Sequence, residues 1–382
     1  MHHVLDKLAL VPALIWLPIA VAALLIWLSE PLARRCGLVD HPKGRKQHEA
    51  VTPVSGGIGV FFAILVGFLL LDSLPRASIA FLCAAALLMV LGILDDLRDL
   101  RWWWRIGMQI AAALILVYFG RVEVQHVGPL LGVKNTGLGW LSLPMTVVAT
   151  VGLINAVNMI DGEDGLAGSL VVSIMAMIAA AAFYSGNAAV ANRAIIVGGA
   201  VIGFLLFNLR FPGRLRARVF LGNGGSAVLG LAIAYFSFRL TQNAKHPVSP
   251  VLALWIAVVP VADCLVLIAR RLKMGRSPFA ADREHVHHLM REAGFGPTRI
   301  AVSLSAFSCV AGLIVAQCMR WDVPNPLLLV AFLLLMLGWY LLTSKRVRVV
   351  RLFRWLRHLG RAGPAELGTL VAEPPRIVDE RS

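Results

Sequence analysis

Charged side chains are scarce in this sequence. Aspartate, glutamate, lysine and arginine make up only 15% of the 382 residues, whereas 58% of the residues are hydrophobic. Soluble domains usually contain about 25% charged residues. The composition therefore excludes an ordinary soluble protein and is typical of a protein with several membrane-spanning helices.

Paired cysteines and long polar segments are also missing. The five cysteines lack paired spacing and mostly lie in apolar runs, so we interpret them as buried hydrophobic residues and expect neither a disulfide framework nor a zinc site. The formal net charge of +15 would suit nucleic acid, but no polar segment is long enough for a nucleic-acid-binding domain. The basic residues instead lie in short loops, a pattern that orients inner-membrane proteins and favours contact with the lipid bilayer.

The apolar runs predict an all-α polytopic membrane protein. A membrane-spanning helix needs about 20 mostly apolar residues. The first run is too long for a signal-peptide core, and no small-residue cleavage site follows it. We expect residues 1–344 to form one integral membrane domain of about eleven helices. Their expected ranges are 8–28, 55–72, 78–95, 105–120, 138–156, 166–184, 192–208, 223–240, 249–270, 300–319 and 326–343.

The loops predict how these helices are oriented. Lys and Arg are concentrated in the loops after the first, third, seventh and ninth expected helices. By the positive-inside rule these loops are cytoplasmic, which places the N-terminus outside and the C-terminus in the cytoplasm. Residues 345–382 then form a cytoplasmic tail. Its beginning is either a basic amphipathic helix on the membrane surface or a stop-transfer charge cluster, and we expect its end to be disordered.

Unusual polar residues collect in the loops that are predicted to be cytoplasmic. The segment 155–168 joins two apolar runs, yet it contains Asn155, Asn158, Asp161, Glu163 and Asp164. Acidic residues are costly next to hydrocarbon, and a simple connecting turn would rather contain Asn, Gly and Ser. Three acids without a Lys or Arg in the segment indicate a site that handles a metal ion or a phosphate.

The end of the third expected helix gives the same indication. Asp95, Asp96 and Asp99 lie at the C-terminus of this helix, where the helix dipole is already negative. Asp95 and Asp99 also share one face of the helix because they are four residues apart. A bound cation explains this arrangement better than a solvated helix end does.

Other segments carry groups that suit phosphate. The first cytoplasmic loop contains Lys46, His48 and Thr52, and a glycine-rich turn at 222–226 can present backbone N–H groups to an anion. Asp263 lies inside an apolar run, which makes it a candidate site residue, with Arg270 or Arg271 as a partner.

The last large loop contains a histidine cluster. Asp282 and Arg283 precede His285, His287 and His288. Three histidines so close together resemble a metal-binding cluster, and a zinc site is one interpretation. No cysteine accompanies them and the acidic segments are rich in oxygen ligands, which favours magnesium as the metal and phosphate as the partner of the histidines.

Together these residues suit phosphoryl transfer at a membrane surface. A metal ion and basic groups neutralise phosphate charge, and glycine turns permit close approach of the backbone. One substrate would then be a lipid and the other a soluble compound. A transporter or flippase for an anionic lipid is the main alternative, but it predicts a ladder of charged residues across the membrane, and the apolar runs contain no such ladder.

The motifs resemble those of the polyprenyl-phosphate N-acetylhexosamine-1-phosphate transferases, in particular their WecA-like branch. The resemblance covers nearly the whole chain and rests on residues 40–57, 95–96, 155–168, 220–226, 282–283 and 285–288. It implies a bacterial inner-membrane enzyme that transfers a sugar 1-phosphate from a UDP-N-acetylhexosamine to undecaprenyl phosphate and releases UMP. N-acetylglucosamine 1-phosphate is the expected group, in the first membrane step of a cell-envelope polysaccharide. A homodimer is compatible with the resemblance.

The resemblance also implies roles for single residues. Asp95, Asp96 and Asp161 would be catalytic, and Mg²⁺, with Mn²⁺ as an alternative, would bind Asp95, Asp96, Asp161, Glu163 and Asn223. Direct attack by the lipid phosphate and a covalent acyl-phosphate on an Asp are rival mechanisms. The substrate-binding residues would be Lys46, His48, Thr52, Asn155, Asn158, Asp164, Asp282, Arg283, His285, His287 and His288.

Two residues depart from the pattern of this family. Asn223 stands where the family usually has an Asp that binds magnesium, and Glu163 stands where it usually has an apolar residue. An Asn carbonyl binds magnesium without adding negative charge. We hypothesise that Glu163 restores the missing charge. The alternatives are that Glu163 faces water and Asn223 weakens metal binding, or that the chain is a less active member.

Overall fold

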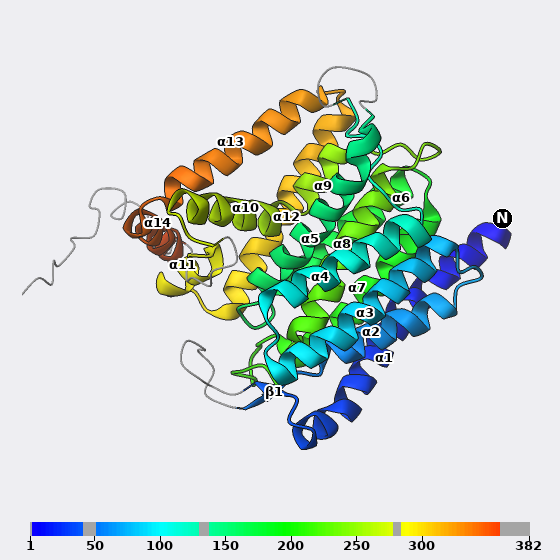
Figure 1. Ribbon diagram of the computed structural model, residues 1–382, viewed down its shortest axis with the longest axis horizontal. Coiled ribbons are helices and arrows are strands. Elements are labelled where there is room, and N and C mark those ends of the chain that lie inside the picture. Colours follow the sequence, from blue (N-terminus) through cyan, green and yellow to red (C-terminus); the bar gives the residue numbers. More distant parts are fainter. Residues whose placement is uncertain (1, 41–50, 130–136, 278–283, 360–382) are drawn as a thin grey trace, which may run out of the picture.

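The computed structural model describes residues 2–40, 51–129, 137–277 and 284–359, which fold into a bundle of helices (Figure 1). The predicted all-α class is confirmed. The elements in chain order are α1 (His2–Arg35), β1 (Val39–Asp40), β2 (Thr52–Pro53), α2 (Gly56–Leu69), α3 (Arg76–Arg98), α4 (Trp102–Leu114), η1 (Ile115–Phe119), η2 (Gly139–Leu141), α5 (Ser142–Ile160), α6 (Leu166–Tyr184), α7 (Ala188–Asn208), α8 (Gly222–Thr241), α9 (Pro250–Ile256), α10 (Val258–Lys273), α11 (Val286–Glu292), α12 (Pro297–Arg320), α13 (Asn325–Thr343) and α14 (Arg346–Leu359). Strands β1 and β2 form one short antiparallel ladder.

The number of candidate membrane spans differs from the expected eleven. The described part of the chain contains nine helices that are long and apolar enough to cross a membrane, or ten if α9 and α10 are one broken span. The expected helix at 55–72 is α2, whose 14 residues extend about 21 Å, less than the roughly 30 Å of a hydrocarbon core. The orientation of the bundle in the membrane stays a prediction.

The expected helix at 249–270 is broken at Ala257. Helices α9 and α10 are inclined by 84° to each other. Pro260 lies in the first turn of α10 and has no N–H to donate to the carbonyl of Ile256. That carbonyl instead accepts a buried hydrogen bond from the Ser308 hydroxyl at 2.9 Å. The bend is therefore stabilised by a partner on α12.

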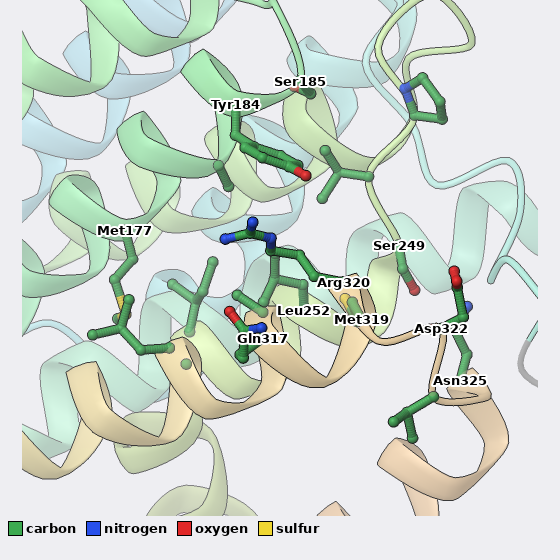
Figure 2. A pocket seen from close by; sticks show the side chains of 18 of the residues that line it. Met177, Tyr184, Ser185, Ser249, Leu252, Gln317, Met319, Arg320, Asp322 and Asn325 are labelled. Atoms are coloured by element: carbon green, nitrogen blue, oxygen red, sulfur yellow. The ribbon is translucent and has the colours of Figure 1, made fainter.

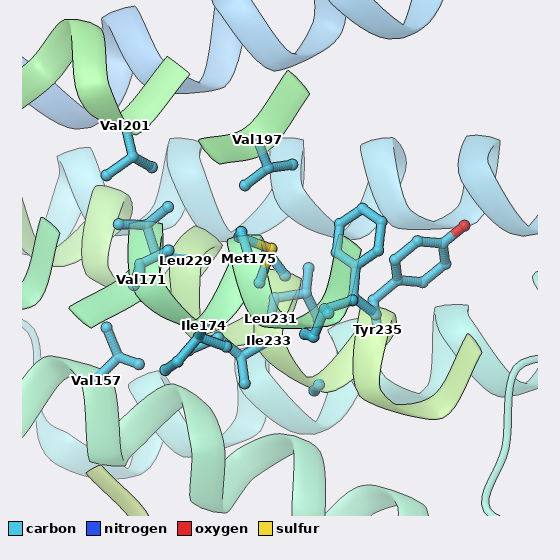
Figure 3. Packing of buried hydrophobic residues seen from close by; sticks show 14 of the residues in the cluster. Val157, Val171, Ile174, Met175, Val197, Val201, Leu229, Leu231, Ile233 and Tyr235 are labelled. Atoms are coloured by element: carbon cyan, nitrogen blue, oxygen red, sulfur yellow. The ribbon is translucent and has the colours of Figure 1, made fainter. Parts of the chain in front are cut away.

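Helix α8 forms the axis of the bundle. It contacts α2, α3, α5, α6, α7 and α9, and 94% of its most apolar window is buried, against 17% for α13. Figure 3 shows Leu229 and Leu231 of α8 among Val157, Ile174 and Val197 from three neighbouring helices. Because α8 faces protein and not lipid, it tolerates the polar and small residues at its start.

Close contact between α3 and α8 depends on glycine. A Cβ atom added to Gly92 would lie 2.1 Å from the Cα of Gly224, a distance that no real side chain tolerates. The two backbones can approach this closely only because both residues lack a side chain. The contact brings the C-terminus of α3, with its aspartates, directly to the N-terminus of α8.

Candidate active site

The polar loops meet at one end of the bundle, which we call the acidic end. Here α3 and α5 end, and α6 and α8 begin. The backbone N–H groups of Gly56 and Gly57 donate to the carbonyls of Phe220 and Leu221, and the N–H of Phe220 donates to Pro53. The first loop is thereby joined to the glycine-rich turn, as the pattern of polar clusters had indicated.

Asp96 caps the start of α8. Both of its carboxylate oxygens accept from the backbone N–H of Asn223, at 3.1 and 3.3 Å. Gly222 makes this approach possible: it has a φ of +79°, and a Cβ there would lie 2.7 Å from an oxygen of Asp96. A carboxylate is favourable at a helix N-terminus, so α8 stabilises the negative charge of Asp96.

Asp95 points in a different direction from Asp96. One oxygen accepts from the N–H of Leu100 at 2.9 Å, and the other lies 3.5 Å from Nε of Arg105. Asp95 and Arg105 line a cavity of about 60 Å³ together with Asn155, Asn158 and Asn223. Asp95 therefore has a basic partner in Arg105.

The two asparagines of α5 also face this cavity. The Asn158 amide donates to Oδ1 of Asn223 at 3.2 Å and to the Ser226 hydroxyl at 2.9 Å. The Asn155 amide donates to Oε1 of Gln109 at 2.7 Å. These bonds tie α5 to both α4 and α8, so Asn155 and Asn158 hold the walls of the cavity together.

Asp161 ends α5 and is electrostatically strained. Burial, and then the negative charges of Asp96 and Asp164, raise the pKa of its carboxyl to about 8. A carboxyl group of this kind gains stability when a cation or a proton arrives. Asp161 is thus the acid at this end that most needs a positive ligand.

The other two acids of the segment have basic partners. Asp164 accepts from Nε of Arg210 at 2.5 Å and from the N–H of Ala217. An oxygen of Glu163 lies 3.5 Å from Arg291 on α11, although burial still raises the pKa of its carboxyl. The hypothesis that Glu163 compensates for Asn223 stays a prediction, and the structure adds Arg291 as a partner of Glu163.

The histidine cluster is anchored by Asp263. Nδ1 of His285 lies 2.8 Å from one carboxylate oxygen of Asp263, and the N–H of Val286 donates to the other at 3.0 Å. The sequence suggested Arg270 or Arg271 as partner of Asp263; Arg270 pairs with Glu284 at 3.0 Å, and Arg271 stays a prediction. Asp263 thus caps α11 and fixes the orientation of the first histidine.

His287 lies directly against the acidic segment. A Cβ on Gly162 would be 2.6 Å from its Nε2, and the ring centroids of His287 and His288 are 4.2 Å apart. Burial, and then His288 and His285, lower the pKa of His287 well below its usual range. Within the described residues, neither ring nitrogen of His287 has a hydrogen-bond partner. A neutral imidazole with two open sites is ready to bind a polar ligand.

The predicted site residues of the first and last large loops are described only in part. Thr52 is buried in β2, where it pairs with Asp40. Lys46, His48, Asp282 and Arg283 lie outside the described residues. The structure adds Arg105, Gln109, Arg210 and Arg291, which the sequence showed only as helix or loop residues. No local pattern distinguishes them, since each acquires its partner through folding.

The acidic end has oxygen donors that fit magnesium. No group of three or more His, Cys, Asp and Glu side chains in the described part of the chain is arranged as a complete metal site. Magnesium does not need one, because it usually binds one or two carboxylates and completes its shell with water and substrate phosphates. Asp161, Asp96 and the side-chain carbonyl of Asn223 supply such a partial set. Asp96 is close enough to Asp161 to repel its negative charge.

A larger cavity lies at the opposite end of the bundle. Figure 2 shows it between the ends of α6 and α12 and the start of α13, with a volume of about 930 Å³. Its lining is mostly apolar, with Arg320 near Tyr184. None of the predicted site residues lines it, so the site is defined by the smaller cavity at the acidic end.

Comparisons with known proteins show the family to which the chain belongs. Residues 78–241 match the model of glycosyl transferase family 4. The undecaprenyl-phosphate alpha-N-acetylglucosaminyl 1-phosphate transferase of Escherichia coli (strain K12) is 34% identical over 313 residues, which cover 81% of this chain and 85% of that protein. Proteins of the same name from Haemophilus influenzae and Yersinia pestis are 33% and 31% identical, over 89% and 88% of this chain and 95% and 93% of their own lengths.

Proposed function

The chain belongs to glycosyl transferase family 4, and on this basis we propose that it transfers N-acetylglucosamine 1-phosphate from its UDP-sugar to undecaprenyl phosphate. The products are undecaprenyl-diphospho-N-acetylglucosamine and UMP. One observation carries the proposal: two contacts form at the same end of a bundle of membrane-type helices. Asp96 contacts Asn223, and His287 contacts the segment 161–164.

The start of α4 supports a lipid as the acceptor. Trp102, Trp103 and Trp104 are all exposed and directly precede Arg105. Exposed tryptophans gather at the level of lipid headgroups in membrane proteins. Arg105 and Asp95, which line the small cavity, would then lie at the depth of a lipid phosphate. Arg105 would neutralise that phosphate, and Asp95 would orient it or take its proton.

The transfer exchanges one phosphorus–oxygen bond for another. An oxygen of the lipid phosphate attacks the β-phosphorus of the donor. The bond from that phosphorus to the oxygen that bridges the α- and β-phosphorus atoms breaks. UMP leaves with the bonding electron pair. Phosphoryl transfer needs positioning and neutralisation of charge more than covalent help from the protein. The paired acids and bases of the acidic end are suited to that task.

Magnesium would be held by Asp96, Asp161 and the carbonyl of Asn223, where it would neutralise the donor pyrophosphate. The strained carboxyl of Asp161, with a pKa of about 8 in the free protein, supports this choice. His287 would contact the donor as a neutral group, because its pKa is held low. A neutral ring suits a hydroxyl or amide of the sugar better than it suits a phosphate.

An assay with the whole protein tests the proposal. The purified chain is incubated in lipid discs with undecaprenyl phosphate, magnesium or manganese, and a panel of UDP-sugars, and UMP and lipid-linked sugar are measured. We expect equal amounts of both products, with UDP-N-acetylglucosamine as the preferred donor. Preference for another UDP-N-acetylhexosamine would correct the donor. Lipid movement without UMP would support the transporter alternative, and a trapped phosphorylated Asp would support the covalent mechanism.

A further inference from the structure

The C-terminal helix α14 is packed against the helix that carries the histidines. Figure 1 shows α14 beside α11, at the end of α13. Val349 and Val350 of α14 are buried together with Leu289 of α11 and with Ala293, the residue that follows α11. This contact gives α14 one apolar face that is fully occupied by protein.

Polar contacts reinforce the packing of α14 on α11. Arg346 donates twice to one carboxylate oxygen of Glu292, at 2.6 and 2.8 Å. Arg357 donates to the carbonyl of Gly294 at 3.2 Å, immediately after α11 ends. Contacts at both ends of α14 therefore fix the position of α14 relative to α11.

Helix α11 transmits that position to the acidic segment. Its His287 lies against Gly162 and its Arg291 pairs with Glu163. A helix of seven residues has little stability of its own. Its place is set by Asp263 at its start and by α14 along its side. A shift of α14 therefore changes where His287 and Arg291 meet the site.

The other face of α14 is basic and exposed. Arg348, Arg351 and Arg354 follow one another at intervals of three residues, so they lie on one side of the helix. All three are exposed, and none forms an ion pair with any side chain in the described part of the chain. Exposed Val347, Trp355 and Leu356 add apolar surface beside them.

The position of α14 places these arginines near the bilayer. Helix α13 is one of the most lipid-exposed candidate spans, and only Ser344 and Lys345 separate its end from α14. A helix that begins two residues after a membrane span must lie close to the headgroup layer. Basic residues there are attracted by anionic lipids, by roughly a fivefold change in binding for each Arg.

We propose that α14 binds the anionic headgroups of the bilayer through Arg348, Arg351 and Arg354 and thereby holds α11 against the segment 161–164. The negative charge of the membrane then sets the affinity for the sugar donor. This inference rests on the proposed function for its kinetic readout, but its structural part can be measured without turnover.

The kinetic test compares two kinds of lipid disc. The full-length protein is placed in phosphatidylcholine alone or in phosphatidylcholine mixed with phosphatidylglycerol, and KM for UDP-N-acetylglucosamine and kcat are measured. We expect the anionic lipid to lower KM about fivefold, with a smaller change in kcat. Soluble glycerol 1-phosphate added to the uncharged discs should not reproduce the effect, because it is not held at the surface.

Two triple variants separate α14 from charge in general. The variant Arg348→Gln/Arg351→Gln/Arg354→Gln should have, in both lipids, the KM that the wild type has in phosphatidylcholine alone. The matched control, Arg216→Gln/Lys273→Gln/Arg276→Gln, removes the same charge from exposed positions outside α14 and should keep the response to phosphatidylglycerol. Equal loss of the response in both variants would overturn the proposal.

Hydrogen exchange of residues 286–292 and 346–358 provides the readout that does not need catalysis. Phosphatidylglycerol should slow exchange in both segments of the wild-type protein and in neither segment of the α14 triple variant. Slower exchange without any UMP release would retain this inference and reject the proposed function. UMP release with no effect of the lipid on hydrogen exchange or on KM would retain the proposed function and reject this inference.

Discussion

Asp263 of α10 and His285 of the loop before α11 form a buried pair, with 2.8 Å between Oδ2 and Nδ1. Their side chains are only 5% and 7% exposed. The second oxygen of Asp263 accepts from the N–H of Val286, so one carboxylate fixes both the first histidine and the start of α11. Asp263 is therefore a positioning residue for the histidine cluster.

The variant Asp263→Asn tests this role. It retains an acceptor for the N–H of Val286 but removes the charge opposite His285. We expect kcat/KM for UMP release to fall by about 10-fold to 100-fold, as for other residues that orient a functional histidine. Most of the loss should appear as a higher KM for the donor. The neighbouring Cys264→Ala is the control, and an unchanged kcat/KM in Asp263→Asn would reject the role.

The pair Asn223 and Glu163 can be tested through the magnesium requirement. Asn223→Asp adds a full carboxylate next to Asp96 and Asp161, so we expect about tenfold less magnesium to give half-maximal activity. Glu163→Gln removes the partner of Arg291, so we expect a higher KM for the donor and an unchanged magnesium requirement. A higher magnesium requirement in Glu163→Gln would instead support charge compensation for Asn223.

Asp161 predicts how magnesium binding depends on pH. The pKa of its carboxyl is raised from 3.8 to about 8, first by burial and then by Asp96 and Asp164. Below about pH 8 the free protein holds a proton there, and magnesium must displace it. Affinity should therefore rise by up to tenfold per pH unit until about pH 8 and then level off. Calorimetry at several pH values, in buffers of different ionisation enthalpy, measures the affinity and the released proton.

The variant Asp161→Asn serves as the control for that experiment. It should bind magnesium weakly and show little pH dependence, because the titrating group is gone. The metal-free variant should also be more stable than the wild type near neutral pH. A raised carboxyl pKa means that the folded state loses stability as pH rises from 3.8 towards 8. Strong pH dependence in Asp161→Asn would assign the proton to another group.

The contact between α3 and α8 predicts a large effect for a single methyl group. Gly92→Ala would place a Cβ 2.1 Å from the Cα of Gly224, so α3 must shift and Asp95 and Asp96 must move with it. We expect a loss of about 1–3 kcal/mol in stability, a lower Tm in detergent and loss of UMP release. Gly107→Ala is the matched control, because nothing lies within 4 Å of that position. Equal Tm values for both variants would contradict the packing argument.

Part of the site could be predicted from the sequence. The polar segments that contain Asp96, Asn158 and Asn223 were expected to gather on one side of the membrane, and hydrogen bonds join these three residues. Such residues stand out in an apolar sequence, because a polar group near hydrocarbon is costly unless it has a partner or a function. Their positions in neighbouring loops then follow from the alternation of helices across a bundle.

The partners of these residues could not be read in this way. Arg105, Arg210 and Arg291 look like ordinary basic residues at helix ends, yet they pair with Asp95, Asp164 and Glu163. The positive-inside pattern explains why arginines are present but not which carboxylate each one meets. That choice depends on the relative rotation of helices that are distant in sequence.

The sequence by itself determined the all-α class and the position of most helices, because the length of each apolar run reflects the thickness of a membrane. The expected range 166–184 and helix α6 have the same bounds. Only the tertiary structure decided the 84° bend at Ala257, the shortness of α2, and the placement of α11 between Asp263 and α14. An apolar pattern predicts that a residue is shielded from water. It does not predict which distant side chain contacts that residue, and these features depend on such contacts.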